Sequence, residues 1–282
     1  MKKQLHIIVA AFMLLVVRCS PQPSNPTMTA YSTTSPDPSP ASTPTESGES
    51  ILQVELDILL DPAIANRIKE QPSKDTDNEI WRNWEPGFIV YRLEGYPLEN
   101  RKDEVRMFIY RVNDIEGDSE HSADNISNLR RLLQNKPDMG AYPITGVDEP
   151  PYHVPWLKPI NATPVMHAGV KYLDFQNGTG MRYLTQYAQA LSVVNNEELY
   201  YTFQGLTQDE KYYIAAVLPV RHPDLLQGAN DAPDGDTSVW ADREKNLQYM
   251  RKMVQMLDEA ESSSFTPDLA NLDAMIRSIS IR

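Results

Sequence analysis

The sequence predicts an α+β fold in which a mainly antiparallel sheet of about six or seven strands is packed by helices. Two pairs of strand-like runs follow one another closely between residues 170 and 218, which favours an antiparallel meander. Other strand-like runs occur before residue 113, and two segments with helical spacing close the chain. The order therefore predicts strands, then a β-meander, then C-terminal helices.

Three runs in the first part of the domain predict strands. Residues 53–60 alternate apolar and polar side chains, and residues 87–96 and 105–112 are rich in β-branched and aromatic residues. After the first run, residues 63–69 are expected to form a short helix capped by Asp61.

Glycine and asparagine mark the turn of the first predicted hairpin. Residues 170–176 and 181–188 flank the segment Asn177-Gly178-Thr179-Gly180. We expect Asn177-Gly178 to form the tight turn, with Gly178 or Gly180 at positive φ. Residues 198–205 and 211–218 flank a second polar turn and predict the next hairpin.

Three further segments have the spacing of amphipathic helices. Their apolar stripes are Ile126, Leu129 and Leu133; then Leu247, Met250, Val254 and Leu257; then Leu269, Leu272, Ile276 and Ile279. We expect Ser122 to cap the first helix and Pro137 to end it. Thr266 is expected to cap the last helix, with Pro267 in its first turn.

Residues 1–19 predict a targeting segment. Lys2 and Lys3 supply positive charge, and residues 5–17 form an apolar run of 13 residues interrupted by His6. A spanning helix needs roughly 20 apolar residues, so a signal peptide is the favoured interpretation and a short uncleaved anchor the alternative. Both place the rest of the chain outside the cytoplasm.

Cys19 is the only cysteine of the chain and stands just after the apolar run. Its surroundings resemble the bacterial lipobox, in which an aliphatic pair and a small residue precede the lipidated cysteine. Val16 and Val17 match this pattern, whereas Arg18 departs from it and is expected to slow processing. The resemblance implies a lipid-anchored protein at the cell membrane, facing outside the cytoplasm.

Residues 20–50 predict a disordered linker, and residues 51–282 a single extracytoplasmic α+β domain. Pro, Ser and Thr fill 21 of the 31 linker positions, so the segment buries too little apolar surface to offset its ordering entropy. The formal net charge of −13 argues against nucleic acid as a partner, because phosphate binding needs a basic surface. The expected first partner is the membrane, through the lipid anchor.

The sequence contains no linear signature of a catalytic site or of a nucleotide-binding loop. We expect no cofactor, and whether the protein is an enzyme stays open. The favoured hypothesis is a tethered binding or interaction module of the cell envelope that takes an envelope protein, a peptide or a glycan. The alternative is an envelope hydrolase whose catalytic residues lie far apart in the sequence.

Five polar and aromatic side chains of the first hairpin are the candidate ligand-binding residues: Tyr172, Asp174, Arg182, Tyr183 and Tyr187. Gln186 lies in the same hairpin. A three-residue turn would place Asp174 opposite Arg182, whereas a turn of two or four residues would make them face apart. The functional hypothesis is a patch that binds a glycan or a peptide. A cross-strand ion pair beside amphipathic strand tyrosines is the commoner arrangement.

Two groups of residues are potential metal ligands. The first is the histidines His153, His167 and His222, and the second is the aspartates Asp231, Asp234 and Asp236. The histidines could converge as ligands or as a general base, although loop histidines are more often plain polar residues. The aspartates suit Ca²⁺, but their spacing does not match an EF-hand loop and is typical of a solvated acidic turn. We therefore expect no metal site.

Three segments carry a resemblance to known proteins. The stretches YLDFQNGTGMRYLTQYAQ (172–189), NNEELYYTFQGLT (195–207) and KYYIAAVLPVRHP (211–223) resemble a family of uncharacterised bacterial lipoproteins. The order of strands and terminal helices is similar to the Mog1/PsbP type of α/β/α sandwich. That class includes exported, lipid-anchored proteins that bind partners and are not enzymes, although a likeness of fold does not carry function.

The anchor can be tested by labelling cells with a fatty-acid probe and measuring the mass of the N-terminal peptide. We expect labelled protein that begins at Cys19, and Cys19→Ser should release the chain or leave an uncleaved precursor. Arg18→Gly should speed maturation, since a small residue fits next to the scissile bond. Unlabelled protein that begins at Met1 would contradict the lipid anchor.

Overall fold

The computed structural model describes residues 54–72, 87–98, 105–141, 154–157 and 162–282. These described residues belong to one compact unit. The expected signal peptide and linker lie outside the described residues, as do Cys19 and His153. The expectations for these segments stay predictions.

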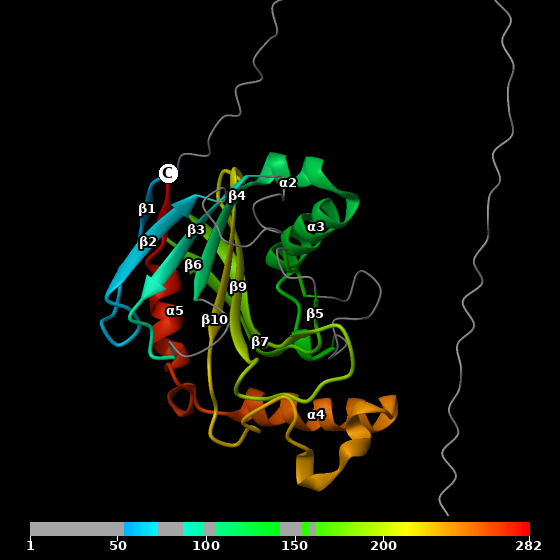
Figure 1. The fold of residues 1–282 in the computed structure, drawn as a ribbon. Helices are drawn as coiled ribbons and strands as arrows, with labels where there is room; N and C mark the ends of the chain where they lie inside the picture. Colours follow the sequence, from blue (N-terminus) through cyan, green and yellow to red (C-terminus); the bar gives the residue numbers. More distant parts are fainter. Residues whose placement is uncertain (1–53, 73–86, 99–104, 142–153, 158–161) are drawn as a thin grey trace, which may run out of the picture. The chain divides into compact units, whose positions relative to one another are not determined.

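A seven-stranded sheet has the strand order β2-β3-β4-β10-β9-β7-β6 (Figure 1). The strands are β2 (Arg67–Pro72), β3 (Phe88–Glu94), β4 (Arg106–Arg111), β6 (Ala168–Phe175), β7 (Gly178–Thr185), β9 (Tyr200–Thr207) and β10 (Tyr212–Pro219). Every neighbouring pair is antiparallel. The α+β class is therefore confirmed, and β6, β7, β9 and β10 form the predicted meander.

Two short strand pairs lie beside this sheet: β1 (Leu56–Asp57) with β11 (Ser280–Ile281), and β5 (Thr163–Pro164) with β8 (Tyr187–Ala188). Asn177 holds β11 in place, because its Nδ2 donates to the Ile281 carbonyl at 2.6 Å and its Oδ1 accepts from the Ile281 N–H at 3.1 Å. The run predicted as strand 53–60 contributes only the two residues of β1 among those described.

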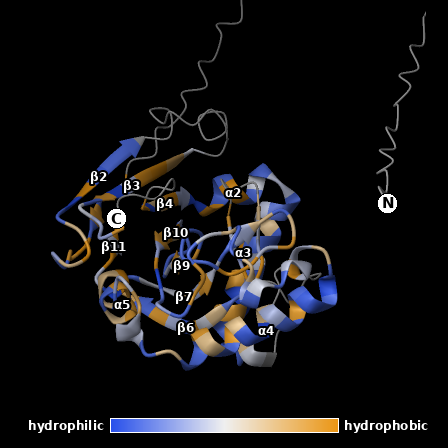
Figure 2. Ribbon diagram, turned by 60° about the horizontal axis from the view of Figure 1, so that its bottom comes forward, coloured by the Kyte–Doolittle hydropathy of each residue, from blue (hydrophilic) through white to orange (hydrophobic). Residues whose placement is uncertain are grey.

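Helices cover both faces of the sheet and create a three-layer arrangement (Figure 1). The helices are α2 (Val112–Asp118), α3 (Glu120–Asn135), α4 (Arg243–Glu259) and α5 (Leu269–Arg277), with 3₁₀ turns η2 (Met139–Ala141), η3 (Pro233–Gly235), η4 (Thr237–Trp240) and η5 (Ser262–Ser264). The pair α2 and α3 packs on one face, and α4 and α5 pack with the core of the other. Figure 2 shows hydrophilic and hydrophobic residues alternating around these helices, as expected for helices with one buried face.

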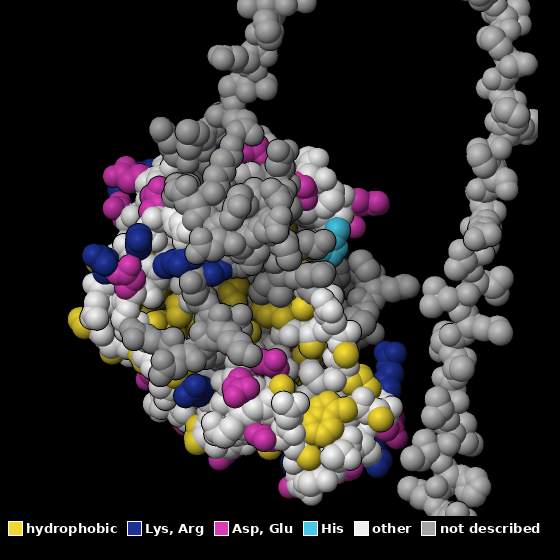
Figure 3. Space-filling model, viewed as in Figure 1, with side chains coloured by type: hydrophobic (Ala, Val, Ile, Leu, Met, Phe, Trp, Pro, Cys, Tyr) yellow, Lys and Arg dark blue, Asp and Glu magenta, His cyan; other side chains and the backbone are white. Residues whose placement is uncertain are grey.

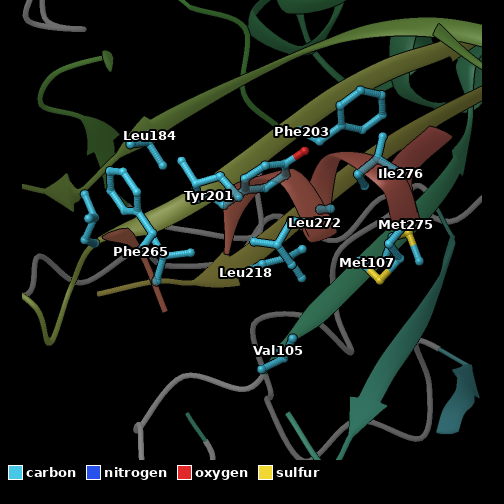
Figure 4. Packing of buried hydrophobic residues seen from close by; sticks show 14 of the residues in the cluster. Val105, Met107, Leu184, Tyr201, Phe203, Leu218, Phe265, Leu272, Met275 and Ile276 are labelled. Atoms are coloured by element: carbon cyan, nitrogen blue, oxygen red, sulfur yellow. The ribbon is translucent and has the colours of Figure 1, made fainter. Parts of the chain in front are cut away.

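The core under α5 follows the predicted apolar stripe. Leu272 and Met275 of α5 point toward Tyr201 of β9 and Met107 of β4, and all four side chains are buried (Figure 4). Ile279 is also buried, although it follows the end of the helix. Burying such side chains supplies most of the free energy that holds the helix on the sheet.

The prediction of a helix at 63–69 is wrong, because residues 67–72 form β2. The Asp61 carboxylate does accept a backbone hydrogen bond, from Ala63 N–H at 2.8 Å, but it closes a turn and starts no helix. Antiparallel pairing of β2 with β3, including an ion pair between Arg67 and Glu94, overrides the local helical pattern.

Two helix caps differ from the predicted ones, and one helix of the structure was not expected from the sequence. The Ser119 hydroxyl, not that of Ser122, caps α3 by accepting from the Ser122 N–H at 3.2 Å. The Asp268 carboxylate, not Thr266, caps α5. The helix α2 was not predicted, because its seven residues are too few to show a clear apolar period.

The turn between β6 and β7 is formed by Gln176-Asn177, so the prediction of an Asn177-Gly178 turn is wrong. Gly178 pairs with Phe175 inside the ladder, and neither Gly178 nor Gly180 has a positive φ. Close packing requires both glycines instead. A Cβ on Gly180 would lie 2.3 Å from the Phe203 ring and 2.5 Å from the Gln204 carbonyl oxygen.

We expect Gly180→Ala to lower the free energy of unfolding by about 1–3 kcal/mol, because a methyl group overpacks the ladder. Gly117→Ala is the matched control, since a Cβ there meets no atom within 4 Å and alanine favours the helix. Urea unfolding of both variants measures the difference. Equal stability of the two variants would contradict this packing.

Candidate functional site

The register of the first hairpin separates the residues that were predicted to form one patch. Asp174 pairs with Thr179 and Lys171 pairs with Arg182, as a two-residue turn requires. Asp174 therefore faces away from Arg182 and accepts a hydrogen bond from the Thr179 hydroxyl at 2.7 Å. The predicted five-residue patch does not assemble on one face.

Two of the predicted tyrosines are held by the protein itself. The Tyr183 hydroxyl donates to the Pro155 carbonyl at 2.8 Å, and that of Tyr187 lies 3.3 Å from the Thr202 hydroxyl. Burial raises the pKa of Tyr183 well above its ordinary value and that of Tyr187 to about 12. Both phenols stay neutral at physiological pH and act as packing groups with a hydrogen-bonded tip.

Arg182 is buried in the sheet layer and is not a ligand-binding residue at the surface. Its guanidinium Nε lies 3.3 Å from Asp273 Oδ1 of α5, and both side chains are almost fully buried. The Tyr201 hydroxyl donates to the same Asp273 oxygen at 3.0 Å. Arg182 Nη1 also donates to the carbonyl of Gly169, which lies in β6. These contacts join three strands to one helix.

Gly169 forms a bulge in β6 and is hydrogen-bonded to α4. Its φ is +56°, and the pairing with β7 shifts between Ala168 and Lys171. While Arg182 binds its carbonyl, the Gly169 N–H donates to the Asp258 carboxylate of α4. Hydrogen bonds to both the carbonyl and the N–H of Gly169 therefore hold the bulge in place.

A cleft of about 620 Å³ lies where this bulge, α4 and residues 137–140 meet; we call it the α4 cleft. Apolar and aromatic side chains from β6 and α4 contribute to it: Val170, Tyr172 and Val254. Its charged side chains are Asp138, Arg251, Asp258 and Glu259. Figure 3 shows charged and hydrophobic side chains interspersed over the part of the molecule where α4 lies. Of the five predicted site residues, only Tyr172 lines this cleft.

His167 supplies a buried acceptor to the α4 cleft. Its Nε2 lies 3.3 Å from the Met139 carbonyl oxygen, which can only accept, so Nε2 carries the proton. Nδ1 then bears the lone pair and makes no hydrogen bond to any residue that the structure describes. Burial lowers the pKa of His167, so the ring is neutral at physiological pH.

A second hollow of about 440 Å³ lies on the other side of α4, beyond the ridge formed by Gln255 and Glu259. It contains His222 and Ser264, whose Nε2 and Oγ are 3.0 Å apart, with an Asp224 carboxylate oxygen 3.9 Å from His222 Nδ1. This group has the residue types of a serine hydrolase triad.

The hydrogen bonds of this second group run opposite to those of a hydrolase. The Ser264 hydroxyl donates its only proton to the Glu261 carbonyl at 2.6 Å, so His222 Nε2 must donate to Ser264. His222 Nδ1 accepts from the Asp224 backbone N–H at 3.3 Å. A triad needs the reverse tautomer, with Nε2 as the base and Nδ1 donating to the carboxylate.

The histidines and aspartates that could have bound a metal do not form one cluster among the described residues. His167 and His222 line different hollows, and Asp231 and Asp236 accept hydrogen bonds from Gly228 and Ser238 in the acidic loop. No group of three or more potential ligands occurs among the residues that the structure describes. The carboxylates of this loop act as local caps.

Comparisons with known proteins find no match for this chain among family models, curated proteins or solved structures. The lipoprotein-family and Mog1/PsbP resemblances therefore stay predictions. Within the described part of the chain, no helix is long and apolar enough to span a bilayer.

The lowered pKa of His167 predicts a pH-dependent stability. Below about pH 6.5 the unfolded chain binds a proton at this position more readily than the folded protein, so the free energy of unfolding falls as the pH falls. His167→Gln keeps a donor for Met139 and removes the titration. Urea unfolding at pH 7.5 and 5.5 should show a smaller loss in the variant; an unchanged loss would contradict a buried, neutral His167.

Proposed function

We propose that the protein is a membrane-tethered binding module outside the cytoplasm and that the α4 cleft is its ligand site. The observation that carries the proposal is a cleft that combines apolar walls, four charged side chains and a buried histidine acceptor. Ligand sites share this pattern of apolar lining with few convergent polar groups. A peptide or a glycan, the ligand classes expected from the sequence, could contact both the apolar and the charged side chains of the lining.

The tether belongs to the same proposal. Cys19 and the Pro/Ser/Thr-rich linker support a domain held away from a lipid surface, and the acidic composition supports an exposed soluble surface. A tethered module of this kind captures ligands near the membrane without needing a catalytic group.

An envelope hydrolase is the second candidate, supported only by the residue types of the His222–Ser264 group. The hydrogen bonds around Ser264 favour a structural role, because its proton is bound to Glu261 and the histidine donates to it. Binding at the α4 cleft is therefore the better-supported function.

The proposal is tested by filling each hollow in turn in the full-length protein. Val170→Trp fills the α4 cleft, and Ala260→Trp fills the second hollow as a matched control. Calorimetric titration with a panel of short peptides and soluble envelope glycans should show binding that Val170→Trp abolishes and Ala260→Trp keeps.

A cooperative thermal transition in both variants shows that they still fold. Binding that survives Val170→Trp, or a panel without any ligand, would overturn the assignment of the cleft.

A further inference from the structure

We infer that the α4 cleft recognises a short peptide with both termini free, about three residues long, with an apolar side chain in the middle. The inference deepens the proposed function and rests on it. It follows from the spacing of unlike charges along α4, with apolar walls and a hydrogen-bond acceptor between them.

The positive end of the cleft is Arg251. Its side chain is exposed, lines the cleft and makes no hydrogen bond or ion pair with any residue among those described. An arginine presents two parallel N–H groups that match a carboxylate, and such charge-assisted pairs are among the stronger hydrogen bonds. Arg251 is therefore placed to bind the C-terminal carboxylate of a ligand.

The negative end is formed by Asp258 and Glu259. Asp258 uses Oδ1 for the Gly169 N–H, and Glu259 uses Oε1 for Gln255 Nε2 at 2.9 Å. Each carboxylate keeps a second oxygen for a ligand. Asp138 adds a third acid to the lining, so acids outnumber the one arginine and favour an ammonium group.

The distance between the two ends sets the length of the ligand. Arg251 and Asp258 are seven residues apart in α4, which places them on one side of the helix and about 10 Å apart along its axis. An extended peptide covers roughly 3.3–3.6 Å per residue, so about three residues join the two ends. A single amino acid is too short to reach both.

The middle of the cleft suits a peptide better than a glycan. Val170, Val254 and the ring of Tyr172 form an apolar stretch for one side chain, and His167 Nδ1 can accept a peptide N–H. A neutral glycan offers no carboxylate to Arg251 and needs a broader aromatic platform than one tyrosine. An inorganic anion would meet three carboxylates.

The experiment is calorimetric titration of the full-length protein with the tripeptide Ala-Leu-Ala, its C-terminal amide and its N-acetyl form. We expect the free tripeptide to bind and each blocked form to bind about tenfold more weakly or worse, since each loses one charge-assisted pair. Arg251→Gln should remove the preference for the free carboxylate. Asp258→Asn keeps an acceptor for Gly169 and should reduce the preference for the free amine.

Lys252→Gln and Glu261→Gln are matched controls, because both residues line the second hollow; they should bind like the unaltered protein. Equal binding of the free, amidated and acetylated peptides would overturn the inference. So would a glycan that binds the cleft while Ala-Leu-Ala does not, although the proposed function would then stand. If no ligand of either class is blocked by Val170→Trp, the proposed function fails together with the inference.

Discussion

The buried ion pair between Arg182 of β7 and Asp273 of α5 is the interaction on which the arrangement of the layers depends. Both side chains are more than nine-tenths buried. Removing Asp273 would leave the buried Arg182 without its counter-ion, and removing Arg182 would leave Asp273 with only the half-exposed Lys171, in a medium that solvates charge poorly. The Tyr201 hydroxyl satisfies Asp273 further, and the rim residue Lys171 approaches the second carboxylate oxygen at 3.7 Å. One guanidinium thus sets the position of α5 over the meander, where Leu272 and Met275 complete the apolar contact.

The same guanidinium connects the core to the proposed ligand site through Gly169. Arg182 binds the carbonyl of this residue, and Asp258 binds its N–H, so the bulge in β6 links the interior to α4. A Cβ at position 169 would lie 2.9 Å from Arg182 Nη1, in a backbone region that residues other than glycine rarely adopt. His167 and Val170 flank the bulge and line the cleft between the edge strand and that helix.

Regular elements could be predicted from the sequence, whereas contacts between distant segments could not. The strand-like runs 170–176 and 181–188, which flank a hairpin signal, predict both strands, and the stripe around Met250 predicts α4. The hairpin turn was misplaced because Asn-Gly is a strong local signal, yet Gly178 is needed inside the ladder for close packing. Arg251 and Asp258 look like the solvated face of an amphipathic helix, and only the bulge and residues 137–140 turn that face into a cleft wall. The sequence near Arg251 and Asp258 gives no sign that the Gly169 bulge and residues 137–140 lie against them.

The most direct test of this account is a double-mutant cycle of Arg182→Met and Asp273→Leu, measured as the free energy of unfolding in urea. We predict that each single variant loses about 3–5 kcal/mol, because it leaves a buried charge poorly compensated, and that the double variant loses far less than the sum. Additive losses in the double variant would show that the two side chains act independently, and would contradict a fold organised around their pairing.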